Sequence, residues 1–229
     1  MILWEAVGCR ESHPVYAQME VENGNRHYSF LQSIVAASLE MGRPFLSTQI
    51  LKALNYHAIA CLHAHAGEFR PCEVTVGHYH PPASHRVQSL MDDFVNSVNR
   101  RWEGHDPLVL ATYVLWKINH IHPFINGNGR TARGACYFVV CVSAGGWLPG
   151  TKILPELLKE QRTEYVNRLR HADETAVNTG IADLGPLHEM VSVLLGEQLQ
   201  SASSNGAADS AAPAAAIDAG QEPVGENGA

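Results

Sequence analysis

The sequence has little positive charge, no long apolar run and few cysteines. It carries 16 Lys and Arg against 23 Asp and Glu, a formal net charge of -7 at pH 7, so broad nucleic-acid binding through a basic surface is not expected. The longest apolar runs are too short to span a bilayer, and the first residues do not resemble a signal peptide. Its 5 cysteines lack zinc-site or redox-pair spacing, which indicates free thiols in a reducing compartment. These absences predict a soluble, cytoplasmic protein that contacts neither membrane nor nucleic acid directly.

Helical periodicity is the main pattern along the chain, which is long enough for one sizeable domain. Apolar residues recur at helical spacing, or as buried apolar runs, in seven segments: 28–41, 47–66, 86–102, 108–118, 134–142, 155–171 and 185–199. One short segment, 74–78, alternates like a strand and ends at two prolines. We therefore expect a polar lead segment over 1–27, a mainly α-helical domain over 28–199, and a disordered Ala/Ser/Gly-rich tail over 200–229.

One stretch between two apolar runs, HPFINGNGRTAR from residue 122 to residue 133, concentrates chemically useful side chains. Gly127 and Gly129 allow positive φ and a close approach of the backbone to a ligand. A helix that begins near Asn128 would present unpaired amide N–H groups and the positive end of its dipole to a phosphate. Arg130 and Arg133 would project from one face of that helix and could clamp phosphate oxygens.

His122 and Phe124 precede this glycine-rich turn. His122 is the group in the stretch whose ordinary pKa suits a general base near neutral pH. Phe124 is apolar between polar neighbours and is expected to anchor the loop in the core. The alternative is a solvated turn followed by a helix with two surface arginines, which explains fewer of these residue types.

The stretch resembles the signature of the Fic (Fic/Doc, Fido-domain) family of protein adenylyltransferases, HxFx[D/E]GNGRxxR. Every defined position matches except the acidic one, which holds Asn126. Family-like features extend over about 28–199 and include AGEFR at 66–70, the segment 74–82 and EYVNRL at 164–169.

This resemblance implies a mainly α Fic-type fold with a short β-hairpin flap beside the active-site loop. It also implies transfer of AMP from ATP to a Ser, Thr or Tyr hydroxyl of a target protein, with His122 as the general base. Arg130 would hold the β/γ side of ATP, and Arg133 the γ-phosphate or an acidic regulatory group. The implied nucleotide-binding residues are Asn126, Gly127, Asn128, Gly129, Arg130, Thr131, Ala132, Arg133, Tyr165 and Asp173. The implied flap residues, which would contact the target, are Val76, Gly77, His78 and Tyr79.

The departure at Asn126 bears on the metal. In relatives the acidic side chain helps to hold Mg²⁺, whereas an amide oxygen is a neutral and weaker ligand. We expect retained adenylylation with weakened use of Mg²⁺ or with Mn²⁺. The alternatives are a different donor, removal of AMP from a target, or a nucleotide- or protein-binding module without catalysis.

Two further features allow alternative interpretations. Glu22 matches the end of an inhibitory motif whose glutamate pairs with the second signature arginine in relatives, but the motif's Ser or Thr is missing, so a solvated acid is the simpler interpretation. An antitoxin-like partner or a homodimer could regulate the protein instead. Several histidines, among them His63, His65 and His78, suggest a zinc site, but ordinary interior or flap histidines fit their spacing better.

Overall fold

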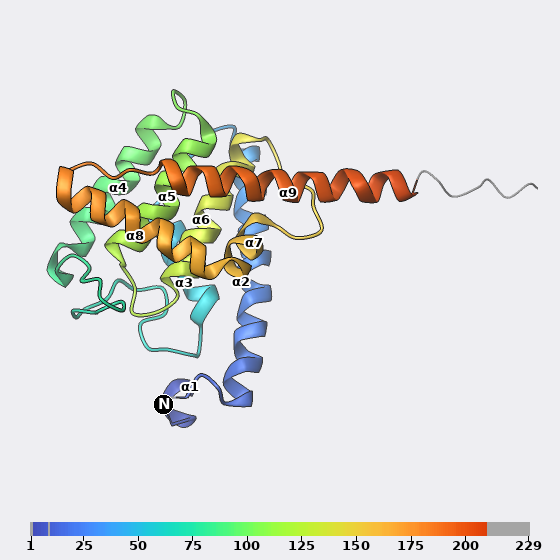
Figure 1. Cartoon of the computed structure of the whole chain (residues 1–229). Helices are drawn as coiled ribbons and strands as arrows, with labels where there is room; N and C mark the ends of the chain where they lie inside the picture. Colours follow the sequence, from blue (N-terminus) through green and yellow to red (C-terminus); the bar gives the residue numbers. More distant parts are fainter. Residues whose placement is uncertain (1, 9, 210–229) are drawn as a thin grey trace, which may run out of the picture.

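The computed structural model describes residues 2–8 and 10–209, with side chains up to residue 203, and the regular secondary structure of these residues is helical apart from one isolated β-bridge (Figure 1). None of the helices in this described part is long and apolar enough to cross a membrane. The elements in chain order are α1 (Leu3–Ala6), α2 (Pro14–Glu40), α3 (Thr48–Ile59), the 3-10 turn η1 (Ser84–Arg86), α4 (Val87–Arg101), α5 (Pro107–Ile121), α6 (Asn128–Ser143), α7 (Leu154–Glu160), α8 (Arg162–Thr179) and α9 (Gly185–Asp209).

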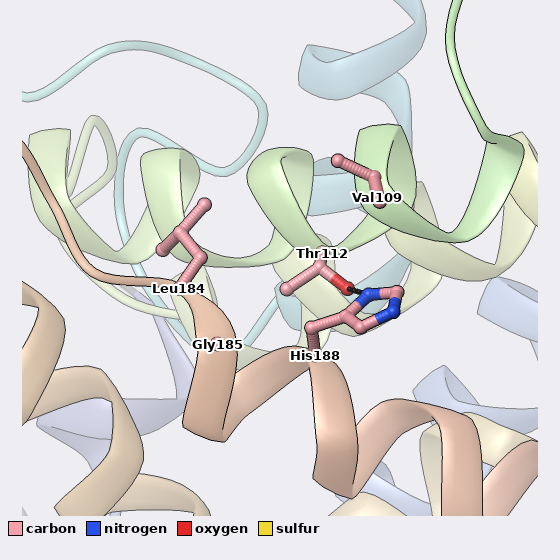
Figure 2. Close-up of a pocket in the computed structure, with 5 residues that line it drawn as sticks. All are labelled: Val109, Thr112, Leu184, Gly185 and His188. Carbon is pink, nitrogen blue, oxygen red and sulfur yellow. Dashed lines mark hydrogen bonds between the residues drawn. The ribbon is translucent and has the colours of Figure 1, made fainter.

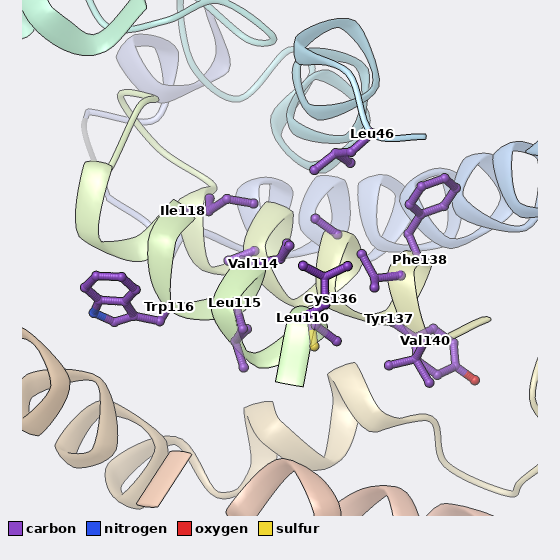
Figure 3. Close-up of a cluster of buried hydrophobic side chains, with 14 of the residues drawn as sticks. Leu46, Leu110, Val114, Leu115, Trp116, Ile118, Cys136, Tyr137, Phe138 and Val140 are labelled. Atoms are coloured by element: carbon purple, nitrogen blue, oxygen red, sulfur yellow. The ribbon is translucent and has the colours of Figure 1, made fainter. Parts of the chain in front are cut away.

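The centre of the fold is the pair of helices α5 and α6, which make the most extensive contact of any two elements described. Figure 3 shows their buried side chains, among them Leu115, Tyr137 and Phe138, each with no exposed surface. Helices α2 and α3 pack together and against α6, while α8 and α9 pack together and against α5. Because α5 and α6 are fixed by this core, the loop that joins them is held at both ends.

Local sequence explains where the central helices begin. Asp106 caps α5, since its Oδ1 accepts hydrogen bonds from the amides of Leu108 and Val109 at 2.8 and 3.0 Å, and Pro107 occupies the first turn. Helix α6 follows Gly127, and no side chain caps its N-terminus. The first amides of α6 therefore lack a capping acceptor at the end of the helix that attracts anions.

The mainly α-helical fold is confirmed, but several expected boundaries differ. Helix α2 begins at Pro14, so most of the expected lead segment 1–27 is helical. Asn23-Gly24-Asn25 consists of residues that favour turns, yet it lies within α2, where Asn23 is buried and its Nδ2 donates to the carbonyl of Ala60 at 2.9 Å. A tertiary contact thus overrides the local turn preference.

The β-hairpin flap is not confirmed. Where a strand was expected over 74–78, the structure has one antiparallel bridge between Val76 and Tyr79, with N···O distances of 2.9 and 3.0 Å around Gly77. Helix α3 also ends at Ile59 rather than near 66, since Cys61 and His65 have positive φ values of 65° and 58°.

The C-terminal helices differ in length from the expected ones. The segment expected as one helix over 155–171 breaks at Gln161 into α7 and α8. Helix α9 continues to Asp209, ten residues past the predicted end at Leu199. Gln198 fixes this helix to the core, because its side chain bonds the hydroxyl of Tyr137 at 2.7 Å and the amide of Leu154 at 2.7 Å. Of the predicted tail, residues 210–229 lie outside the described residues.

Replacing Phe138 with Ala should lower the free energy of unfolding by about 3–5 kcal/mol, because it leaves a cavity in the core beside Trp102. Chemical denaturation measures this change. The control Val109→Ala, on the exposed side of α5, should change stability by less than about 0.5 kcal/mol. Equal effects of the two substitutions would contradict the burial of Phe138 in the core.

Candidate active-site loop

The loop between α5 and α6 is closed by its own side chains. The Asn128 side chain accepts from the amide of Phe124 at 2.9 Å and donates to the carbonyl of the same residue at 2.8 Å. The Phe124 ring is fully buried, as the sequence predicted, and lies 5.5 Å from the ring of Phe69. These contacts fix the turn before any ligand binds.

Gly127 is required by both its backbone and its surroundings. Its φ is 79°, and a Cβ there would lie 2.8 Å from Asn55 Nδ2 and 2.9 Å from a methyl carbon of Ile59. Asn55 is buried and ties the loop to α3, because its amide donates to the carbonyl of Asn126 at 2.8 Å and to the Thr131 hydroxyl at 3.3 Å. The sequence analysis missed Asn55, since a polar residue on an apolar helix has no distinctive signal of its role.

His122 ends α5 in the left-handed region, with φ 51° and ψ 58°. Burial lowers the pKa of His122 from its ordinary value to about 4, a hydrogen bond with the backbone of Asn119 opposes this shift, and the Arg70 guanidinium adds to it. The imidazole is therefore neutral at pH 7 and can accept a proton.

Arg70 holds His122 in this position. Its side chain is fully buried, and it donates from Nε to the carbonyl of His122 at 2.9 Å, from Nη1 to the carbonyl of Cys72 at 2.9 Å, and from Nη2 to the carbonyl of Pro82. One guanidinium thus joins His122 to both ends of the segment from Cys72 to Pro82, here called the flap segment. These hydrogen bonds hold the segment against the loop although it forms no sheet. The sequence placed Arg70 only within a family-like segment. Its hydrogen bonds to three backbone carbonyls could not be predicted, because they depend on how the chain folds.

Arg133 lies beside the start of α6, where a Cβ on Gly129 would be 3.2 Å from its Nη1. Burial lowers the pKa of Arg133, and the nearby hydroxyls of Tyr165 and Tyr28 oppose that shift. Within the described residues no carboxylate lies within ion-pair distance of this guanidinium. A largely buried cation next to uncapped amides is suited to an anionic ligand.

Arg130 lies on the same helix but already has protein partners. It donates to the carbonyl of Ala58 at 3.0 Å and to Asn126 Oδ1 at 3.4 Å, and its Nη1 lies 3.3 Å from the carboxylate of Glu20 on α2. Glu22, the acid named from the sequence, is exposed on α2 instead. The contact of Glu20 with Arg130 was not predicted, because the sequence analysis expected a helix only from residue 28, whereas α2 begins at Pro14.

The neighbouring loop residues have structural contacts. The Thr131 hydroxyl donates to the carbonyl of Gly127 at 3.0 Å, and Ala132 is buried in the core. Asn126 Oδ1 accepts from the amide of Gly127 at 2.6 Å in addition to Arg130. Since this oxygen faces two N–H donors, the described arrangement does not suit Asn126 as the ligand of a cation, and its metal role stays a prediction.

The expected nucleotide-binding residues on α8 lie in the interior. Tyr165 is buried and its hydroxyl accepts from Asn119 Nδ2 at 2.9 Å. Asp173 Oδ1 lies 2.7 Å from His120 Nδ1 and accepts from the Trp116 indole at 2.9 Å. Both side chains are thus close to the end of α5, but Asp173 is engaged by protein partners.

The flap segment is attached to the same group of residues. The Tyr79 hydroxyl donates to the carbonyl of His120 at 2.7 Å, and burial together with the nearby Asp173 carboxylate raises its pKa. Val76, Gly77 and His78 are exposed. Of the four flap residues named from the sequence, Tyr79 therefore anchors the segment. The other three are exposed and accessible to another protein chain.

One surface notch lies elsewhere, between α5 and the start of α9, and Figure 2 shows its lining residues. Its polar groups are Thr112 and His188, whose Oγ1 and Nδ1 lie 3.4 Å apart. Neither belongs to the residues named from the sequence as a site.

The helical scaffold that carries this loop is similar in fold to solved Fic domains. Residues 45–140 match the model of the Fic/DOC family. The "Protein adenylyltransferase Fic" of Drosophila persimilis is 37% identical over 109 residues, which are 47% of this chain and 20% of that protein. The chain thus matches about a fifth of the length of such curated relatives.

Solved structures support the fold. Fic-1 (residues 134–508) from C. elegans superposes with a TM-score of 0.64 and 23% identity, covering 84% of this chain and 52% of that one. A Fic domain-containing signaling protein from Bacteroides thetaiotaomicron gives a TM-score of 0.62 and 22% identity, covering 80% of this chain and 70% of that one.

Arg70→Lys should destabilise the protein and detach the flap segment, because a lysine cannot reproduce the fork of donors to three carbonyls. Each buried carbonyl left without a donor costs about 1–3 kcal/mol, which chemical denaturation would detect. The matched control is Arg86→Lys at the exposed η1 position, expected to change stability by less than about 0.5 kcal/mol. A wild-type stability for Arg70→Lys would exclude this structural role.

Acidification should destabilise the protein partly through His122. Its pKa is about 4 in the fold against an ordinary 6.5, so the unfolded chain binds its proton more readily, and stability present above pH 6.5 is lost as the pH falls towards 4. His122→Gln should therefore flatten the dependence of unfolding free energy on pH between 6.5 and 4. Buried His27 shifts in the same direction, so part of the slope should persist. An unchanged slope in His122→Gln would contradict the shift.

Proposed function

We propose that this chain transfers AMP from ATP to a Ser, Thr or Tyr hydroxyl of a target protein, with His122 as the general base. The observation that carries the proposal is Arg133, a largely buried guanidinium that has no carboxylate partner among the described residues and lies at the uncapped start of α6. Phosphate oxygens would supply the missing negative charge and accept from the free amides. The names of the curated relatives support the same reaction class.

The proposed reaction starts with a target hydroxyl beside neutral His122. The imidazole accepts the hydroxyl proton as that oxygen attacks the α-phosphorus, and the bond between the α-phosphorus and the pyrophosphate oxygen breaks. AMP remains on the target, and pyrophosphate leaves with the displaced negative charge. Arg133 and the amides of Gly129 and its neighbours stabilise that charge, so the protein contributes mainly positioning and electrostatics.

Arg130 would bind ATP only after its ion pair with Glu20 is broken. Its guanidinium faces Glu20 in the structure, and the β/γ-phosphates of ATP would replace that carboxylate. Val76, Gly77 and His78 would receive the target segment through main-chain contacts, because they are exposed while Tyr79 anchors the segment beside the base. The divalent cation that accompanies ATP would neutralise phosphate charge. Regulation by an antitoxin-like partner or a homodimer belongs to the same proposal.

A second candidate function is favoured by Asn126. Its amide carries no charge and its oxygen is occupied by the Gly127 amide, so a different donor, removal of AMP, or nucleotide binding without catalysis would also suit this site. The persistence of the neutral base and of Arg133 favours a transferase.

The test is incubation with α-labelled ATP and Mg²⁺ or Mn²⁺, with label read on the protein and on candidate target proteins. His122→Ala should lower the labelling rate by about 10²–10⁴-fold while ATP binding, measured by calorimetry, is retained. The exposed His65→Ala is the matched control and should label like the wild type. Absence of label with both metals, while ATP still binds, would favour the binding module, and label from another donor would redefine the substrate.

A further inference from the structure

Helix α1 and the first turns of α2 cover the end of α3 and form with it a small, separate hydrophobic cluster. Val7, Tyr16 and Leu62 are its buried members, and the amide of Trp4 donates to the carbonyl of Leu62 at 3.1 Å. His63 follows directly and its ring lies 5.2 Å from that of Trp4 and 6.1 Å from that of Tyr16. This cluster brings His63 to the active-site loop, although the two are far apart in sequence.

His63 touches the loop at the position where the family signature has an acid. Its Nε2 lies 3.0 Å from Asn126 Nδ2 and 2.9 Å from the Tyr16 hydroxyl. The opposite end of the Asn126 amide, Oδ1, accepts from Gly127 N at 2.6 Å and from Arg130 Nη2 at 3.4 Å. Asn126 is therefore held between one ring nitrogen and two N–H donors.

These contacts determine the direction of each hydrogen bond. The Gly127 amide and the Arg130 guanidinium can only donate, so the oxygen of Asn126 faces them and its NH₂ group faces His63. His63 Nε2 must then be an acceptor whose single lone pair is shared by the Asn126 amide and the Tyr16 hydroxyl, with the ring proton on Nδ1. If the Asn126 amide turned by 180°, its NH₂ group would face two other donors.

We propose that His63 is a positioning residue, which acts through Asn126 to orient the Gly127 amide and the Arg130 guanidinium for the nucleotide phosphates. The inference rests on the proposed function, because phosphate binding is what these groups would perform. In place of an acid, the chain has an amide whose orientation is set by a histidine from a different part of the fold.

The kinetic test compares two replacements of His63. His63→Gln keeps an acceptor oxygen, whereas His63→Leu keeps an apolar side chain beside Trp4 but cannot accept a hydrogen bond. His63→Leu should lower kcat/KM for ATP by about fivefold to tenfold, the loss expected for one hydrogen bond, and His63→Gln should stay within about twofold of the wild type. The matched control is His65→Leu, whose exposed side chain contacts Glu68. Equal losses for His63→Leu and His63→Gln would overturn the proposal.

A double-mutant cycle separates positioning from a general effect on folding. In an Asn126→Ala background the two His63 variants should have the same kcat/KM, because the amide that His63 orients is gone. A loss for His63→Leu that persists in this background would also overturn the proposal. Denaturation curves identify any variant that is unfolded.

A measurement independent of activity uses nitrogen-15 NMR of the imidazole rings. The expected result is His63 with a protonated Nδ1 and an unprotonated Nε2, assigned by comparison with His63→Gln. If the wild type transfers no AMP, the proposed function fails, but this tautomer would still support the orienting contact. A proton found on Nε2 would overturn the inference whatever the activity.

Discussion

The packing of α5 against α6 is the constraint on which the site depends. Both helices are buried along most of their length, so the residues between them cannot move as a free loop. His122 leaves α5 in a left-handed conformation and Gly127 enters α6 in the same region. The Asn128 side chain forms two hydrogen bonds with the backbone of Phe124. These bonds fix the position of the loop after His122 relative to the start of α6.

Three arginines near this turn have different surroundings and therefore different roles. Arg70 is surrounded by carbonyl oxygens and is structural. Arg130 faces Glu20 together with the Ala58 carbonyl, so a ligand must compete for it. Arg133 has no ion-pair partner among the described residues, although burial disfavours its charge. Of the three guanidinium groups, that of Arg133 would thus gain most from an anionic ligand, and the dipole of α6 also favours an anion there.

The loop is also connected to parts of the chain that carry no signature. Asn55 on α3 bonds its backbone, Arg70 bonds the carbonyl of His122, and His63 bonds the side chain of Asn126. These contacts position the proposed catalytic groups before the nucleotide arrives, which lowers the cost of organising them in the reaction. Asn55 and Arg70 are buried and bond the backbone of the loop, so they contribute to its geometry.

The sequence by itself determined the helical class and the main segments of the core, because the 3.6-residue apolar period reports which face of a helix is buried. It also predicts which residue types come together in the loop, since the residues from His122 to Arg133 are contiguous in the sequence. Only the tertiary structure decided the start of α2, the absence of a strand at 74–78 and the partners Glu20, Asn55, Arg70 and His63. Those features depend on contacts between residues distant in sequence, whose burial and hydrogen bonds outweigh local propensity.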